Sequence, residues 1–309
     1  MSACAFARGV DTKHTQHPRA ARSARVMICV NEHLPVLTSM IRTLKPRVLA
    51  HAQGSGPSGE SSGSAFYTLE RLPPILTSLG ESLPATRSDI DLGAGSVAFT
   101  IDGILTDTEA DALAACGEAI LEFNGQSRMA PGITTPPGMR RNFAAHWFPL
   151  APDAGAFFPA LYARIKHLLP TSVGGEPLHD ELNQKLALFR YNEDDRFERH
   201  SDGVFPGQGA NERGDGVDAW VGTNSRLSML LYLTDAGDGL RGGETRLWRL
   251  DGGGHVDVPP RKGSALFFQH GAGPGSVMHE GRPVEGAIPK YMTRMNVLYG
   301  RRQGTRPLY

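Results

Sequence analysis

The sequence predicts a mainly β protein with flanking helices, built as an antiparallel sandwich or barrel. The 309 residues include 37 Gly and 22 Pro, so turns are plentiful and a helical bundle is disfavoured. Beyond Leu186, short apolar runs are separated by Gly, Asp and Asn turns, with no helical pattern between them. Strands at this spacing are typical of antiparallel sandwiches and barrels. Two helical patterns precede the strand series.

The elements can be placed in order along the chain. Residues 97–101 have strand composition. Thr106 has Glu109 three residues later, a capping box that predicts a helix from Thr106 to Phe123. A second helix is expected over residues 156–169, ending before a proline. Strands are then expected at Leu186–Tyr191, Arg226–Leu233, Glu244–Leu250, His255–Val258, Ala265–Phe268 and Tyr291–Tyr299.

Residues 1–90 differ in composition from the rest. Up to position 59 the acids are Asp11 and Glu32 alone, and residues 54–64 have the composition of a flexible linker. We therefore expect residues 1–90 to form a disordered or poorly structured extension, and residues 91–309 to form the functional domain. An acid-poor, Arg- and Ser-containing start also fits an organelle transit peptide, or a stretch upstream of the true start.

Composition excludes several classes of protein. Lys and Arg together number 32, as do Asp and Glu, so the net charge is zero and a nucleic-acid partner is disfavoured. Three scattered cysteines are too few for a disulfide framework or a thiolate metal site. There is no apolar run of membrane-spanning length. We expect a soluble intracellular protein, cytoplasmic, or mitochondrial or plastid if the N-terminus is a transit peptide.

A candidate metal site begins at His200 and Asp202. In an extended chain these two side chains point to the same side. A His and a carboxylate projecting together supply two of the three ligands of the facial triad that binds non-haem iron(II). His255, His270 and His279 are candidates for the third. His270 ends an expected strand and is better suited to a structural or supporting role, and His255 lies beside a glycine turn.

His279 precedes a strand that carries Lys290 and Arg294. Such a strand would supply the cation that the distal end of a dicarboxylate cosubstrate requires.

The motifs then become recognisable as an ordered set. The chain resembles the Fe(II)- and 2-oxoglutarate-dependent oxygenases of the prolyl 4-hydroxylase type over about residues 99–299. The matching motifs are Arg190-Tyr191, Phe197, His200-Ser201-Asp202-Gly203, Ser228–Leu233, Gly242-Gly243-Glu244-Thr245, Pro260, Gly263, His279-Glu280-Gly281 and Lys290-Tyr291. The resemblance implies a double-stranded β-helix, or jelly roll, over about residues 183–301, packed by N-terminal helices.

The resemblance also implies the site residues. His200, Asp202 and His279 would bind Fe(II), and Lys290 would pair with the distal carboxylate of 2-oxoglutarate, with Arg294 as a second inward cation. Tyr191 and Tyr232 would donate hydroxyl groups to that carboxylate, or would be core aromatics with satisfied hydroxyls. O2 is the second substrate, and ascorbate is expected to support turnover.

Three departures from the family pattern stand out. Asp194 occupies a turn position where the family often has Gly, and Asn296 stands where it has Asp. The gap between His279 and Lys290 is one residue longer than usual, which suggests a loop extension around residues 286–289. The extra residue leaves open whether Lys290 or Arg294 meets the cosubstrate.

The leading function is a dioxygenase that hydroxylates a C–H bond of an unknown protein or small-molecule substrate, peptidyl proline being the family precedent, with release of succinate and CO2. A non-catalytic jelly-roll module that binds a metal or ligand is the alternative. The retained Asp202 argues against a halogenase, and a cupin-like enzyme would need three histidines. The long segment 203–224 is expected to form a mobile lid, with Phe205 or Trp220 lining the substrate pocket.

Overall fold

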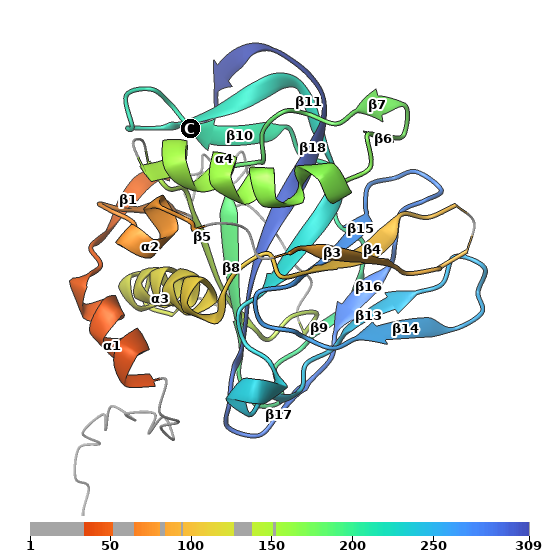
Figure 1. Cartoon of the computed structure of the whole chain (residues 1–309), viewed down its shortest axis with the longest axis horizontal. Coiled ribbons are helices and arrows are strands. Elements are labelled where there is room, and N and C mark those ends of the chain that lie inside the picture. The colour runs from red at the N-terminus through yellow and green to blue at the C-terminus, as the bar shows by residue number, and fades with distance from the viewer. Residues whose placement is uncertain are drawn as a thin grey trace, which may run out of the picture.

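The computed structural model describes residues 34–51, 65–80, 84–93, 95–126, 138–150 and 153–308. Its largest element is a sheet with the strand order β1-β2-β5-β8-β18-β11-β15-β4-β3, in which β10 also pairs with β11 (Figure 1). The strands are β1 (Pro46–His51), β2 (Ala65–Leu69), β3 (Thr86–Asp89), β4 (Ala98–Asp102), β5 (Phe143–Trp147), β8 (Leu186–Tyr191), β10 (Gly207–Ala210), β11 (Val217–Tyr232), β15 (Ala265–Gln269) and β18 (Lys290–Pro307).

A smaller sheet has the order β14-β13-β16-β9. It consists of β9 (Phe197–His200), β13 (Thr245–Trp248), β14 (His255–Val258) and β16 (His279–Gly281). Two short strand pairs accompany it, β6 (Ser172–Val173) with β7 (Glu176–Pro177), and β12 (Arg241–Gly242) with β17 (Val284–Glu285).

The path of the chain between the two sheets defines a jelly roll. From β8 onward it passes from the large sheet to β9 in the small sheet, returns to β11, enters β13 and β14, returns to β15, enters β16 and ends in β18. The four central strands of the large sheet, β8-β18-β11-β15, therefore face the four strands of the small sheet. This is the predicted double-stranded β-helix.

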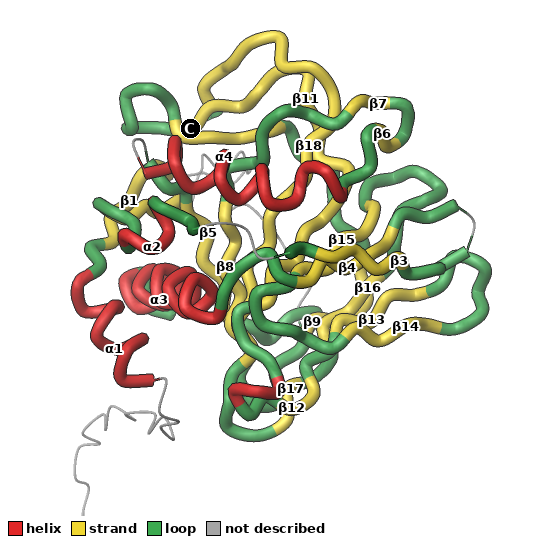
Figure 2. Tube along the Cα trace, viewed as in Figure 1, coloured by secondary structure: helices red, strands yellow, loops and turns green. Residues whose placement is uncertain are grey.

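Four helices accompany the sheets in the described part of the chain: α1 (Leu34–Thr43), α2 (Pro74–Thr77), α3 (Asp107–Phe123) and α4 (Asp153–Ile165). Short 3-10 turns follow at Lys166–Leu168 and Ala236–Asp238. The predicted capping box starts α3, because the Thr106 hydroxyl accepts from the Glu109 amide and the Glu109 carboxylate accepts from the Thr106 amide. Figure 2 shows α3 and α4 together on one side of the large sheet.

The two faces of the large sheet bury different cores. Apolar side chains of α3 and α4 pack with the outer face, whereas the inner face packs with the small sheet. Side chains alternate along β8, so Leu186 and Leu188 belong to the outer core while Ala187 and Phe189 belong to the inner one. The inner face of β8 and β18 therefore faces the interior of the barrel. The candidate site lies in this interior.

The expectation that residues 1–90 form a poorly structured extension is wrong for much of that stretch. Strand β2 joins β5 in parallel, with Tyr67 opposite Trp147, and β3 pairs with β4. Phe66 is 1% exposed and Leu76 is fully buried. The burial of these side chains outweighs the linker composition of the neighbouring residues 54–64. Residues 1–33, 52–64 and 81–83 are outside the described part of the chain.

Segment 203–224 is also more regular than expected. β10 forms an antiparallel pairing with the start of β11, from Gly207 opposite Trp220 to Ala210 opposite Val217, and movement of the segment as a lid stays a prediction. The glycines are required here, because a Cβ at Gly207 or Gly209 would lie 2.8 Å from the Trp220 ring. The glycine-rich composition thus reflects close packing of strands under an indole ring.

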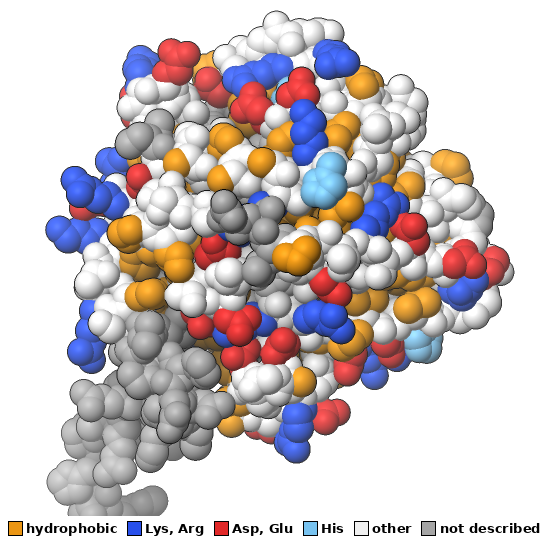
Figure 3. All heavy atoms as spheres, in the orientation of Figure 1, with side chains coloured by type: hydrophobic (Ala, Val, Ile, Leu, Met, Phe, Trp, Pro, Cys, Tyr) orange, Lys and Arg blue, Asp and Glu red, His pale blue; other side chains and the backbone are white. Residues whose placement is uncertain are grey.

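Two further observations concern the surface. On the face shown in Figure 3, acidic and basic side chains are intermingled, with no broad area of one sign. None of the described helices is long and apolar enough to cross a membrane.

Candidate metal centre

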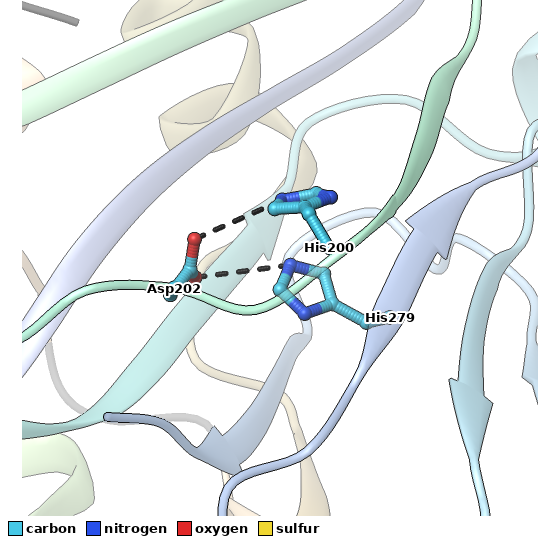
Figure 4. Close-up of side chains that lie close together, drawn as sticks. All are labelled: His200, Asp202 and His279. Carbon is cyan, nitrogen blue, oxygen red and sulfur yellow. Dashed lines mark ion pairs between the residues drawn. The ribbon is translucent and has the colours of Figure 1, made fainter. Parts of the chain in front are cut away.

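His200, Asp202 and His279 converge at one end of the small sheet (Figure 4). His200 ends β9, Asp202 follows two residues later, and His279 begins β16 directly opposite His200 in the antiparallel register. One donor atom from each residue lies within 4.8 Å of the others. The Nε2 atoms of His200 and His279 are each 3.8 Å from a different oxygen of Asp202.

Hydrogen bonds orient both imidazoles toward the common centre. The Nδ1 atom of His200 lies 2.7 Å from the Glu198 carbonyl oxygen, and Nδ1 of His279 lies 3.3 Å from that of Val277. A carbonyl can only accept, so each Nδ1 is the protonated nitrogen and each Nε2 keeps its lone pair for a metal. Burial lowers the pKa of His279 to about 3, which keeps that ring neutral, the form that binds metals.

Packing fixes the ring planes as well. The Phe197 ring stacks on His200 with centroids 3.7 Å apart, and Phe268 lies 4.3 Å from His279. The donor set of two imidazoles and one carboxylate suits iron(II) and leaves coordination positions open for other ligands. The residues present therefore fit the metal that the sequence predicts.

Asp202 is held by neighbours from two strands of the large sheet. The Ser228 hydroxyl donates to Oδ2 at 2.5 Å, and Nη1 of Arg294 lies 3.1 Å from Oδ1. Burial opposes the charged form of Asp202, but Arg294, the two imidazoles and Ser228 outweigh it and hold the pKa of this carboxyl well below its usual range. Asp202 is therefore ionised at neutral pH.

His270 has the supporting role that the sequence suggested. Its Nδ1 lies 2.9 Å from the Ser228 hydroxyl and its Nε2 lies 2.8 Å from the Ser225 hydroxyl. It therefore reaches Asp202 only through Ser228. His255 lies on β14 beside Asp257 and Trp248, away from the triad.

Lys290 lies deep in the barrel. It is 1% exposed, its Nζ donates to the Gly243 carbonyl at 2.6 Å, and it lies 5.3 and 5.4 Å from the Tyr191 and Tyr232 ring centroids. Burial lowers the pKa of Lys290 to about 7, partly offset by Glu244. Gly243 makes room for it, because a Cβ there would lie 3.2 Å from Cδ of Lys290.

A cavity of about 440 Å³ joins the triad to Lys290. This volume is in the range of small-molecule sites. All three members of the triad line it, together with Lys290 and Arg294.

Comparison with known proteins places this arrangement in a family. Residues 186–298 match the family model of the 2OG-Fe(II) oxygenase superfamily. The match begins at β8, includes all three residues of the triad and Lys290, and ends within β18. Residues 186–298 form a 2OG-Fe(II) oxygenase domain.

Several solved structures are similar to this chain at low identity. A viral collagen prolyl hydroxylase from Paramecium bursaria Chlorella virus-1, in a 2OG complex, is 17% identical, with 68% of this chain and 100% of that chain covered and a TM-score of 0.44. A Pseudomonas putida prolyl-4-hydroxylase is 17% identical, with coverages of 74% and 98% and a TM-score of 0.41. No curated protein matches the chain by sequence.

A third similar structure is a Trichoplax adhaerens prolyl hydroxylase in complex with a peptide fragment of the hypoxia inducible factor oxygen degradation domain. It is 16% identical, with coverages of 73% and 87% and a TM-score of 0.42.

Of the remaining site residues predicted from the sequence, some line the cavity and others do not. Tyr191 and Phe205 line the cavity, and Phe205 is 36% exposed. Tyr232 is not among the lining residues, because its hydroxyl donates to Thr245 at 2.9 Å, and Thr245 lines the cavity instead. This is the core-aromatic alternative for Tyr232.

Trp220 was predicted wrongly as a pocket residue. Its ring is buried between His179, 6.0 Å away, and the Arg302 guanidinium, 4.6 Å away, outside the cavity lining. The pairing of β10 with β11 directs it there, and this pairing was not predicted.

Two of the departures from the family pattern are explained. Asp194 has a φ of 62°, a left-handed conformation that Asp tolerates better than most residues. Residues 286–289, where a loop extension was expected, form the turn between β17 and β18, and the ladder begins beyond it with Lys290 opposite Tyr191.

Sequence reasoning missed four residues that border the site. Ser228 was identified only as part of a Ser-rich strand, His146 was interpreted as an ordinary surface or core histidine, and Arg140 and Lys185 were not singled out. All but Ser228 line the cavity. Arg140 precedes β5, Lys185 immediately precedes β8 and His146 lies within β5. None of these three residues belongs to a family motif, so only their positions relative to β5 and β8 could have placed them.

Proposed function

We propose that the oxygenase hydroxylates a C–H bond of its substrate while converting 2-oxoglutarate and O2 to succinate and CO2. The observation that carries this proposal is the buried His200–Asp202–His279 triad at one end of a cavity whose other end holds Lys290. The metal would be held by the triad, and a dicarboxylate would extend from it toward the buried cation. When bound, iron supplies the activation of O2 and the oxidation of the substrate.

Lys290 is the proposed anchor of the distal carboxylate. Arg294 is a poorer candidate because its guanidinium already pairs with Asp202 beside the metal position. The two residues are four apart on β18, which corresponds to roughly 13 Å of strand. A carboxylate that reaches the Lys290 ammonium exchanges water for a charged donor in a buried setting, which favours binding only if the pair is well hydrogen-bonded. Tyr191, whose ring borders Lys290, is a second proposed contact.

The chain's own residues would perform three tasks. Nδ1 hydrogen bonds keep His200 and His279 in the tautomer that presents Nε2. Ser228 and Arg294 keep Asp202 ionised and oriented. Phe197 and Phe268 pack against the imidazoles of His200 and His279 and would hold their ring planes in place. Ascorbate is proposed as a reductant that maintains iron(II) between turnovers.

The test is conversion of 2-oxoglutarate to succinate by the purified protein with iron(II), O2 and ascorbate. We expect slow conversion without a prime substrate and faster conversion when a substrate is present. A protein that binds iron(II) and 2-oxoglutarate but forms no succinate with any candidate substrate would instead be a jelly-roll binding module. Peptidyl proline belongs in the first substrate panel, since prolyl hydroxylases are the family that the motifs resemble, alongside small molecules.

A further inference from the structure

A group of basic side chains lies on the metal side of the cavity, away from Lys290. Arg140, Lys185 and Arg294 line this part of the cavity, and we call them the basic wall. Their charges are close enough to affect one another. Arg294 lowers the pKa of Arg140 in addition to the larger effect of burial, and burial followed by Arg294 lowers the pKa of Lys185 to about 8.

The sheet register explains why the wall exists. His146 of β5, Ala187 of β8 and Arg294 of β18 lie opposite one another across three neighbouring strands. Lys185 precedes Ala187 by two residues, so it projects from the same face. Ala187 has the small side chain in this row, which leaves a recess between His146 and Arg294. All four residues border the cavity.

The cationic side chains that line the cavity outnumber the carboxylates beside them. Among the described residues that line the cavity, Arg140, Lys185, Lys290 and Arg294 are cationic and Asp202 is the one carboxylate. Asp202 pairs with Arg294, and neither Arg140 nor Lys185 forms an ion pair with a described residue. A bound divalent metal would add further positive charge beside them. One 2-oxoglutarate dianion would offset only part of this excess.

The basic wall and its neighbours His146 and Gln208 also contain buried polar atoms that lack hydrogen-bond partners. Nη2 of Arg140, Nε of Arg294, Nδ1 of His146 and Oε1 of Gln208 are buried and have no hydrogen-bond partner among the described residues. His146 is 2% exposed and Gln208 is 5% exposed. A buried polar group without a partner costs about 1–3 kcal/mol, so several in one recess indicate that a ligand completes them.

The Arg140 guanidinium is held in place without being neutralised. It lies 5.1 Å from the Phe189 ring centroid and 4.9 Å from that of Phe197, and its Nε donates to Asn142. This arrangement leaves the Nη groups for a ligand. The rigid guanidinium fork suits a planar carboxylate, which it can bind through two parallel hydrogen bonds.

We propose that the basic wall binds a carboxylate of the prime substrate and so positions the C–H bond beside the metal. This inference rests on the proposed function and deepens it, because it identifies the prime substrate as a carboxylic acid. It also differs from the expectation of a neutral peptidyl proline. The cavity volume favours a free small acid over an acidic side chain of a polypeptide.

The test uses inorganic sulfate as a minimal oxyanion. The protein is first saturated with Mn(II) and N-oxalylglycine, a non-reactive analogue of 2-oxoglutarate, so that Lys290 is already occupied. Sulfate is then titrated while the melting temperature is followed. We expect a saturable rise in the wild type, with the half-saturating concentration increased at least tenfold in Arg140→Met and in Lys185→Met. Arg140→Lys should lose less affinity than Arg140→Met, because it keeps the charge but not the guanidinium fork.

Arg246→Met is the matched control, because Arg246 pairs with Asp257 on the small sheet and does not line the cavity. It should respond to sulfate as the wild type does. A rise that is equal in all variants, or that does not saturate, overturns the proposal. A saturable sulfate response that is present with Mn(II) alone and absent from the N-oxalylglycine-saturated protein also overturns it, since the wall would then hold the cosubstrate.

Two competitors distinguish the sources of the carboxylate. L-glutamate represents a free acid, and acetyl-Gly-Glu-Gly-amide represents an acidic side chain in a polypeptide. Displacement of sulfate by either competitor supports carboxylate binding at the basic wall and shows whether a free acid or a polypeptide side chain supplies the carboxylate. If neither displaces sulfate, the carboxylate assignment is overturned. Succinate formation is measured separately. Protein that turns over 2-oxoglutarate but shows no saturable sulfate binding loses this inference and keeps the proposed function.

Discussion

Arg294 lies 3.1 Å from the Oδ1 atom of Asp202, so the second inward cation of β18 supports a proposed metal ligand. Lys290, four residues earlier on the strand, donates to the Gly243 carbonyl and forms no ion pair with any residue that the structure describes. The two cations therefore have different surroundings although they share one face of one strand. Their substitution should separate cosubstrate binding from metal binding.

Replacing Lys290 with Met should raise the Michaelis constant for 2-oxoglutarate by two to three orders of magnitude. Loss of one member of a buried ion pair costs about 3–5 kcal/mol, and about 1.4 kcal/mol corresponds to a tenfold change in affinity. Iron(II) affinity should change little, and the melting temperature should not fall, because an unpaired buried cation is unfavourable in the empty protein. The measurement is a 2-oxoglutarate titration with succinate as the readout.

Arg294→Met is the comparison for that experiment. It should weaken iron(II) binding, because Asp202 loses a cationic partner, while the Michaelis constant for 2-oxoglutarate changes less than in Lys290→Met. A larger loss of 2-oxoglutarate affinity in Arg294→Met would transfer the anchoring role to Arg294.

Binding of 2-oxoglutarate should depend on pH through Lys290. The pKa of this amine is about 7 in the empty site, and a bound carboxylate would raise it. Below pH 7 the amine is already charged, so the dissociation constant should be nearly constant. Above pH 7 binding must take up a proton, and the dissociation constant should rise by up to about tenfold per pH unit.

Calorimetry in two buffers of different ionisation enthalpy measures that proton uptake, which should approach one proton at pH 8. Lys290→Arg is the control, because a guanidinium stays charged throughout this range. Equal proton uptake in Lys290→Arg and in the wild type would assign the effect to another group.

The metal ligands should be separable from their supporting residues by alanine substitution. His279→Ala should nearly abolish iron(II) binding and succinate formation, because two ligands hold the metal poorly. His270→Ala should leave measurable binding, since its ring reaches Asp202 only through Ser228. His255→Ala, at an exposed position on β14, should behave as the wild type. Retention of iron by His279→Ala with its loss in His270→Ala would reverse the assignment.

Ser228→Ala should reduce iron(II) affinity by roughly 10–100-fold, the range typical of residues that orient a metal ligand. The substitution removes the hydroxyl that donates to Oδ2 of Asp202. Ser225→Ala is the matched control, because Ser225 contacts the far nitrogen of His270 and not the ligand itself. Competition with a metal indicator measures both affinities. Equal losses in the two variants would show that the hydrogen-bonded chain acts as a unit.

The sequence was most informative where residues act in a fixed local pattern. His200 and Asp202 could be placed together because alternation in a strand is independent of the rest of the fold, and the capping box at Thr106 depends on four residues. The ordered motifs then implied His279 and Lys290, whose convergence depends on the pairing of distant strands. By contrast, Trp220 was misplaced because its environment depends on the pairing of β10 with β11. Arg140 and Lys185 were missed because they precede β5 and β8 and lie outside any motif.

The N-terminal segment should contribute to stability, contrary to its linker-like composition. Phe66 is 1% exposed, lies on β2 and contacts the Phe148 ring edge-on with centroids 5.6 Å apart. Truncating a buried Phe costs about 3–5 kcal/mol. At roughly 2–4 °C per kcal/mol for a domain of 150–250 residues, Phe66→Ala should lower the melting temperature by at least about 6 °C.

Val48→Ala is the control for Phe66→Ala, because Val48 is 41% exposed on the neighbouring strand β1 and should change the melting temperature by less than about 2 °C. Phe66 also lines the cavity beside Lys185, whose Nζ lies 5.2 Å from its ring centroid. The substitution should therefore weaken sulfate binding at the basic wall even at temperatures where the protein is fully folded. A melting temperature in Phe66→Ala equal to that of Val48→Ala would show that residues 65–69 are dispensable, as the composition alone suggested.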